Sequence, residues 1–278
     1  MISVALSFHK RAARWLTRKV FKFTGVHFYH GTRVYFPKNS YTLRILRTKG
    51  AFEPDNVRLL QELTTPGTWF FDVGTNVGLM SVGVLASVAD SRVVSFEPSP
   101  NVLSFLQSSM AASPFRERWI LVPKAVGAKE GKASFSLSAA ENSEFDGIKN
   151  TRRVHSMKQV EVEMTTVDRE WRRLGSPVVS VLKCDVEGGE LAVLRGARDC
   201  LRANRPAVLV EWNRQNLEAY NIDAKTLVDF AVETAYQLFA VPTLVRIQTA
   251  EELRLHMILT ENFLLIPRDK SGASATAL

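Results

Sequence analysis

The 278-residue chain lacks several features that would place it in a specialised class of protein. It has no apolar run of roughly 18 residues, so we expect no transmembrane helix. Its two cysteines, Cys184 and Cys200, cannot build a disulfide framework, and we expect two reduced, buried thiols in a cytoplasmic protein. Bases interrupt the apolar positions of the first 20 residues, so the start does not resemble a secretory signal.

Acidic residues are absent from the first 50 positions, which hold 11 Lys and Arg residues; the first acid is Glu53. The formal net charge of +8 therefore belongs to this segment, and the remainder holds 25 bases and 28 acids. This distribution argues against nucleic acid as the partner. Apolar and basic positions recur at helical spacing over residues 8–23 and predict a basic amphipathic helix. Two interpretations stay open: contact with an anionic membrane surface, or packing on the body with the bases solvated.

The pattern of the chain predicts three parts: residues 1–50 with the basic helix and short strands, a main domain over 51–267, and a disordered tail over 268–278. Within the main domain, apolar runs alternate with helical patterns, which is typical of a mostly parallel, doubly wound α/β sheet with helices on both faces. The final two strands lack a clear helix between them and predict one antiparallel strand. The expected strands cover residues 69–73, 92–96, 119–126, 178–184, 207–212, 236–241 and 262–266, and the expected helices 76–89, 99–112, 189–203 and 223–235.

Residues 131–165 interrupt this alternation. We expect two strands there, 133–137 and 160–164, flanking a polar loop over 139–157. His155 lies in that loop and could reach over a site as a base or a substrate contact, although an isolated loop histidine is more often solvated.

The first strand and turn carry Asp72, Gly74, Asn76 and Gly78. Gly74 leaves room for a ligand beside the backbone, and Gly78 allows close packing of the following helix. A dinucleotide-binding loop needs a third closely spaced glycine, which Asn76 replaces. Glu97 ends the second strand, where an acid can accept hydrogen bonds from ribose hydroxyls. The alternative is that Asp72 caps the helix and Glu97 is a surface acid.

The fourth strand delivers Lys183 and Asp185 to one face of its carboxyl end, and Glu187 and Glu190 follow. Acids and a lysine at this edge indicate proton transfer or cation handling. Lys183 and Asp185 could instead form a structural ion pair, and Glu190 could complement the helix dipole. A Mg²⁺ site built from Asp185, Glu187 and another acid is a further alternative, although our prediction is a site without metal. Glu211 ends the fifth strand and extends the wall.

Together these segments resemble the FkbM family of S-adenosylmethionine-dependent methyltransferases. The resemblance implies a class I methyltransferase fold: a Rossmann-like, mostly parallel seven-stranded sheet whose last-but-one position is filled by an antiparallel strand. It also implies O-methylation of hydroxyls on sugars or polyketide-like metabolites. Cys184 and Gly189 depart from the residues that related proteins often carry, Ile and Ala. The matching segments are Asp72-Val73-Gly74-Thr75-Asn76-Val77-Gly78, Phe96-Glu97-Pro98, Thr166-Val167-Asp168, Lys183 to Glu190, and Val210-Glu211.

A methyl-transfer mechanism gives each of these positions an expected role. The cofactor, S-adenosylmethionine, is expected at Asp72, Gly74, Asn76 and Gly78, with Glu97 on the ribose and Ala125-Val126 by the adenine. Asp185 and Glu187 are expected to flank the transferred methyl and the acceptor hydroxyl, with Lys183 tuning Asp185. Glu190, Glu211 and His155 are the predicted substrate contacts. The alternatives are an NAD(P)-dependent oxidoreductase and a non-catalytic module that binds RNA or a membrane.

Overall fold

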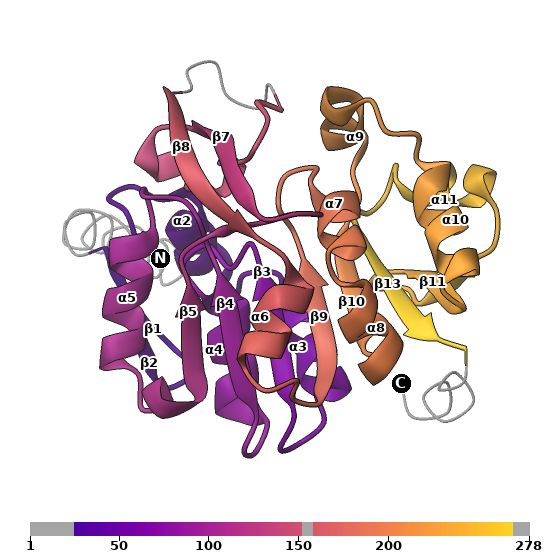
Figure 1. The fold of residues 1–278 in the computed structure, drawn as a ribbon. Coiled ribbons are helices and arrows are strands. Elements are labelled where there is room, and N and C mark those ends of the chain that lie inside the picture. The colour runs from indigo at the N-terminus through magenta and orange to yellow at the C-terminus, as the bar shows by residue number, and fades with distance from the viewer. Residues whose placement is uncertain (1–24, 152–157, 269–278) are drawn as a thin grey trace, which may run out of the picture.

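The computed structural model describes residues 25–151 and 158–268. The predicted basic helix over residues 8–23, His155 and the tail from residue 269 lie outside the described residues. The described chain folds into a central eight-stranded sheet, a three-stranded sheet and a two-stranded N-terminal hairpin, with helices around them (Figure 1).

The central sheet is made of short apolar strands that helices cover on both faces. Phe70 and Phe71 point to opposite faces and are both fully buried, as a strand of this kind requires. The strand order is β12-β11-β13-β10-β9-β3-β4-β5. The strands are β3 (Trp69–Val73), β4 (Arg92–Phe96), β5 (Trp119–Val122), β9 (Val179–Cys184), β10 (Ala207–Glu211), β11 (Tyr236–Ala240), β12 (Val245–Ile247) and β13 (Asn262–Pro267).

The direction of the strands confirms the class I methyltransferase arrangement. Strands β5, β4, β3, β9 and β10 are parallel, and β13 lies antiparallel between β10 and β11. The expected count of seven strands is wrong by one. After β11 the chain turns back, and the three residues of β12 pair antiparallel with its free edge.

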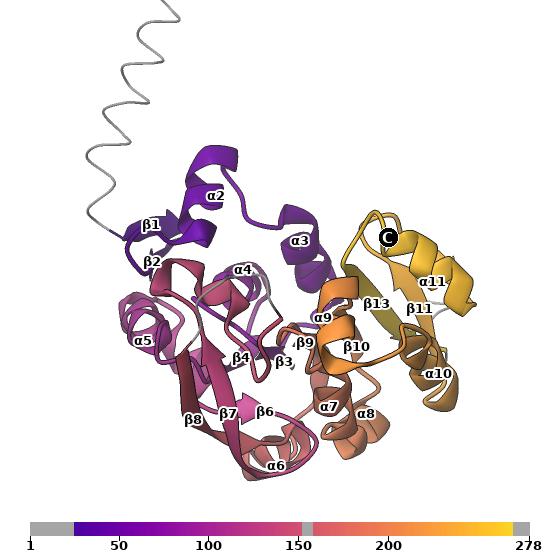
Figure 2. The same ribbon diagram turned by 90° about the horizontal axis from the view of Figure 1, so that it is seen from above.

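Two layers of helices enclose the sheet (Figure 2). On one face Leu60, Val84 and Leu106 bring three helices into a buried cluster, and on the other face Leu194 and Leu227 bring two helices into a second cluster. The helices are α3 (Pro54–Leu63), α4 (Leu79–Ser87), α5 (Leu103–Ala112), α6 (Val167–Arg173), α7 (Glu190–Arg195), α8 (Arg198–Asn204), α9 (Arg214–Tyr220), α10 (Lys225–Glu233) and α11 (Ala250–His256).

Several predicted boundaries are wrong for local reasons. The helix expected over 189–203 is split at Gly196, where the backbone lies so close to Gly127 that an added Cβ would stand 2.1 Å from the carbonyl oxygen. The strand expected over 119–126 stops at Val122, because Pro123 has no N–H for the ladder. Helices α3, α9 and α11 were not predicted, although Pro54 stands at the start of α3 and a capping box of Thr249 and Glu252 begins α11.

The insertion between β5 and α6 forms the second sheet. Strands β7 (Gly131–Leu137) and β8 (Lys158–Thr165) pair antiparallel, which confirms the two strands expected beside the polar loop. The short β6 (Ala125–Val126) completes this sheet along β8. A 3-10 helix, η2 (Ala140–Phe145), starts the loop and contacts the N-terminal helix α2 (Tyr41–Lys49).

The N-terminal residues share the core of the main domain. A hairpin of β1 (Val26–Tyr29) and β2 (Thr32–Tyr35) precedes α2, where only strands and turns were expected. Ser40 caps α2 and Gly50 ends it in the left-handed conformation. Phe36 and Leu46 belong to the same buried cluster as α3 and α4. The expected boundary at residue 50 therefore does not separate two cores.

The structure bears on two features of the sequence, the lack of a long apolar run and the small number of cysteines. Among residues 25–151 and 158–268, no helix is long and apolar enough to cross a membrane. Cys184 and Cys200 are buried and carry free thiols, as expected.

Candidate active site

A cleft of about 570 Å³ opens at the carboxyl ends of the central parallel strands. This is the edge at which open α/β sheets bind their ligands. Nine of the predicted site residues line the cleft: Gly74, Asn76, Glu97, Ala125, Val126, Lys183, Asp185, Glu187 and Glu211.

The loop after β3 approaches the end of β9 too closely for a side chain. Gly74 has φ +78°, and a Cβ there would stand 1.7 Å from the carbonyl oxygen of Asp185. Asn76 also lies in the left-handed region, at φ +50°. The close approach of the Asp185 backbone therefore requires glycine at position 74, which also lines the cleft.

Asp72 and Gly78 do not line the cleft. Asp72 is fully buried, and its Oδ2 accepts hydrogen bonds from the hydroxyls of Thr75 at 2.7 Å and Ser81 at 2.6 Å. An added Cβ at Gly78 would stand 2.7 Å from the Trp119 ring. The predicted cofactor contacts of these two residues are thus replaced by supporting roles: Asp72 ties the loop to α4, and Gly78 admits a tryptophan.

Glu97 lies at the end of β4 with its carboxylate held by backbone. Its Oε2 accepts from the N–H of Asn76 and its Oε1 from the N–H of Ser99, both at 2.8 Å. Burial raises the pKa of Glu97 to about 7 against the lowering effect of these hydrogen bonds, and Asp146 adds to the increase. Glu97 is thereby fixed in direction while it lines the cleft.

Asp146 was not predicted, and it fastens the insertion to the loop that holds Glu97. Its Oδ2 accepts from Ser99 Oγ at 2.6 Å and Asn101 Nδ2 at 2.9 Å. Its Oδ1 accepts from the N–H and the hydroxyl of Ser138, at 2.6 and 2.7 Å. The only sequence signal was an acid in a polar loop, and nothing local indicated its partners.

Lys183 connects the loop after β3 with the residues that follow β9. Its Nζ donates to the carbonyl oxygen of Gly74 at 3.0 Å and lies 3.2 Å from Asp185 and 3.7 Å from Asp72. Burial alone would lower the pKa of Lys183, but the carboxylates of Asp185, Asp72 and Glu53 outweigh it and raise the pKa. The side chain is therefore an ammonium, which pairs with Asp185 as the spacing predicted.

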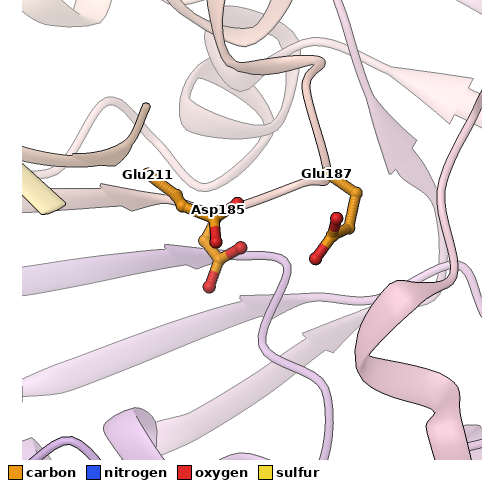
Figure 3. A group of neighbouring side chains, drawn as sticks. All are labelled: Asp185, Glu187 and Glu211. Atoms are coloured by element: carbon orange, nitrogen blue, oxygen red, sulfur yellow. The ribbon is translucent and has the colours of Figure 1, made fainter. Parts of the chain in front are cut away.

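Three carboxylates lie close together after strands β9 and β10 (Figure 3). One oxygen each of Asp185, Glu187 and Glu211 lies within 4.8 Å of the others. Glu187 is held in the left-handed region at φ +57°, and Asn216 donates to Glu211 at 2.9 Å. The three predicted acids thus meet at one point, where they could orient a hydroxyl group or hold one divalent cation.

Glu190 does not line the cleft. It is 1% exposed, and its Oε1 accepts from the N–H groups of Val186 at 2.9 Å and Gly188 at 3.1 Å. Burial raises its pKa to about 7. The predicted substrate contact is therefore replaced by a positioning role, because Glu190 holds the backbone on both sides of Glu187.

Three further parts of the cleft wall were not predicted. Tyr41 and Ile45 of α2 line it, and so does Glu53, whose carboxylate accepts from Asn56 at 2.8 Å. Glu144 of η2 also lines it, and both of its carboxylate oxygens are buried without a hydrogen bond in the described part of the chain. Burial raises the pKa of Glu144 to about 7. The cap at Ser40 was the available sign of α2.

The chain was compared with curated proteins and with solved structures. No curated protein gives a match. Methyltransferase FkbM from Methylobacillus flagellatus KT aligns at 14% identity and a TM-score of 0.44, over 81% of this chain and 60% of that one. A methyltransferase from Geobacter sulfurreducens aligns at 15% identity and 0.44, over 82% and 87%. An O-methyltransferase from Bacillus cereus, solved in complex with SAH, aligns at 11% identity and 0.38, over 81% and 87%.

The sequence itself carries the assignment. The methyltransferase FkbM domain matches residues 72–238, more than half of the chain, from the end of β3 to β11. That range contains the cleft residues described above, apart from Tyr41, Ile45 and Glu53. The chain therefore belongs to the FkbM family of methyltransferases.

Proposed function

We propose that the protein is an S-adenosylmethionine-dependent O-methyltransferase whose acceptor is a hydroxyl group of a sugar, a glycan or a secondary metabolite. One observation carries the proposal. A single cleft brings the Gly74 loop and Glu97, which suit an adenosine-containing cofactor, against Asp185 and Glu187, which suit a hydroxyl group.

The cofactor half fits its ligand in three ways. Gly74 offers backbone without a side chain, Glu97 offers fixed carboxylate oxygens for ribose hydroxyls, and Ala125 and Val126 offer a small apolar wall. When bound, the cofactor supplies a methyl group that is already activated on a sulfonium. The protein must then align the acceptor, and such alignment is worth roughly 7–11 kcal/mol.

The acceptor half provides the proton chemistry. Asp185 and Glu187 lie on either side of the acceptor hydroxyl, and one of the two carboxylates accepts its hydrogen bond and takes up its proton as the new bond forms. Lys183 pairs with Asp185 at 3.2 Å and, through the Gly74 carbonyl, holds it in register with the cofactor loop. Glu211 orients the acceptor from the next strand.

This mechanism needs no divalent cation, because the Lys183 ammonium already compensates the charge of Asp185. We therefore expect EDTA, followed by gel filtration, to leave the rate of methyl transfer unchanged. A loss of activity that Mg²⁺ or Mn²⁺ restores would assign the three carboxylates to a metal instead.

The family match favours this function over the two alternatives. An NAD(P)-dependent oxidoreductase would share the sheet but not the FkbM domain over residues 72–238. A non-catalytic module would have no need of three facing carboxylates at the cleft.

Titration calorimetry tests the cofactor half. The wild-type protein is expected to bind S-adenosylmethionine and S-adenosylhomocysteine but not NADH. Glu97→Ala should weaken binding at least tenfold, since it removes charge-assisted hydrogen bonds. Glu117→Ala, at an exposed acid with 86% side-chain exposure, is the matched control. Unchanged affinity in Glu97→Ala would remove the ribose role.

Transfer itself is tested with a cofactor labelled at the methyl group. A panel of neutral sugars, glycans and hydroxylated metabolites is incubated with the protein, and labelled products are identified by mass. Label on a hydroxyl oxygen supports the proposal. Label found only on nitrogen or carbon atoms would replace it with another methyl transfer.

A further inference from the structure

Residues 25–50 form a segment without acids, and its exposed side is called the basic face below. The segment contains five bases, Arg33, Lys38, Arg44, Arg47 and Lys49, and no Asp or Glu. All of them except Arg47 are exposed. This charge differs from that of the remainder of the chain, in which acids outnumber bases.

The hairpin turns one side to solvent. Thr32 and Val34 are fully buried, whereas Phe28 and Arg33 lie opposite each other across the two strands on the outer side. The Phe28 side chain is 69% exposed. An exposed phenylalanine beside an exposed arginine suits the boundary between lipid headgroups and acyl chains, where the ring can leave water and the guanidinium can contact headgroups.

Helix α2 connects the hairpin with the cleft. Arg47 donates to the carbonyl oxygen of Val26 at 3.1 Å, so the helix and β1 form one unit. Tyr41 and Lys49 line the cleft from the same helix, and the guanidinium of Arg44 lies 5.2 Å from the Tyr41 ring. Figure 2 shows β1, β2 and α2 together at one edge of the molecule. The basic face therefore adjoins the cleft.

We propose that the basic face docks the protein on an anionic membrane surface and places the cleft beside acceptors held there. Each base near such a surface contributes attraction to anionic headgroups. Residues 25–50 contain no acid, and Glu144 of the neighbouring η2 is an acid whose charge interacts with Arg44. The position of the acceptor rests on the proposed function, whereas the docking does not.

Vesicle co-sedimentation of the full-length chain tests the docking. The probes are phosphatidylcholine vesicles and vesicles that also contain phosphatidylglycerol. We expect binding to the anionic vesicles only, and weaker binding at high salt. Arg33→Glu/Arg44→Glu should reduce partitioning by at least about 25-fold, from about fivefold per base. Phe28→Ser should reduce it further. Lys129→Glu/Arg195→Glu, at two exposed bases elsewhere, is the control for net charge.

Three results would overturn the proposal. These are equal binding to both kinds of vesicle, equal losses in the Arg33/Arg44 variant and the control, and displacement from anionic vesicles by single-stranded RNA at equal charge concentration. Circular dichroism and thermal unfolding verify that each variant is folded. Because the assay contains neither cofactor nor acceptor, an inactive protein that binds vesicles contradicts only the proposed function, and an active protein that ignores them contradicts only the docking.

Discussion

The two halves of the cleft treat their acids differently. In the cofactor half, Glu97 is surrounded by donors, with a backbone N–H on each carboxylate oxygen. In the acceptor half, Asp185, Glu187 and Glu211 face one another, and Lys183 is the cation beside them. An acid that donors surround is fixed and serves recognition. Carboxylates that face one another repel, and a hydroxyl group or a proton placed between them relieves this repulsion.

The halves also differ in how their shape is maintained. The cofactor half depends on close approach of bare backbone at Gly74. The acceptor half depends on a buried carboxylate, Glu190, which holds the N–H groups on either side of Glu187. A substitution should therefore act through steric clash in the first half and through lost hydrogen bonds or charge in the second.

The largest effect is expected from Gly74→Ala. The new Cβ would stand 1.7 Å from the Asp185 carbonyl oxygen, a backbone atom that cannot move without shifting the end of β9. We expect loss of cofactor binding and several kcal/mol of stability, measured by calorimetry and urea unfolding. Gly67→Ala is the matched control, because Gly67 has a similar φ of +76° with nothing within 4 Å of its Cβ position. Similar losses in both variants would show that backbone strain, not contact with β9, is what Gly74 relieves.

The second effect concerns turnover. Asp185→Asn/Glu187→Gln removes the carboxylates that take up the hydroxyl proton and should slow methyl transfer by about 10²–10⁴-fold. Cofactor affinity should stay close to wild type, since Glu97 and the Gly74 loop are unchanged. Single-turnover rates with labelled cofactor measure this, with Glu218→Gln/Asp229→Asn on exposed helices as the control. Full turnover in the Asp185/Glu187 variant would exclude both as essential groups.

The sequence predicted the central sheet and the cleft floor because both depend on local patterns. Apolar runs buried on both faces define β3 and β9, and the residues at their carboxyl ends must meet at one edge. The direction of Asp72 could not be predicted, because the hydroxyls that hold it, on Thr75 and Ser81, become its partners only when α4 packs on the sheet. Long-range partners likewise explain why Asp146 was missed.

A third effect concerns Asp146, which holds the loop that carries Glu97 in the cofactor half. Asp146→Asn leaves one of its two acceptor oxygens, so that part of the contact with Ser99 and Ser138 is lost. We expect S-adenosylhomocysteine to bind roughly tenfold more weakly, because the loop that orients Glu97 loosens. Asp168→Asn is the control: that carboxylate also accepts two backbone hydrogen bonds, at 3.0 and 2.8 Å, but lies outside the cleft. It should cost stability and leave cofactor affinity intact. Equal affinity losses in both variants would reduce Asp146 to a structural residue.

The effect with the smallest consequence for function is a pH dependence of stability, to which Glu190 of the acceptor half contributes. Burial raises the pKa of Glu190 to about 7, above its value near 4.5 in the unfolded chain. The resulting stabilisation is complete below pH 4.5 and disappears as the pH rises through 7, which amounts to about 3 kcal/mol. Glu190→Gln keeps an acceptor oxygen for Val186 and Gly188 but cannot ionise, so its unfolding free energy should fall less between pH 5 and pH 8 than that of the wild type. Glu117→Gln, at an exposed site, should follow the wild type. If the unfolding free energies of the wild type and Glu190→Gln fall in parallel with pH, the pKa of Glu190 is not raised by folding. Glu190 would then be an ionised carboxylate that the N–H groups of Val186 and Gly188 stabilise, as backbone N–H groups hold Glu97.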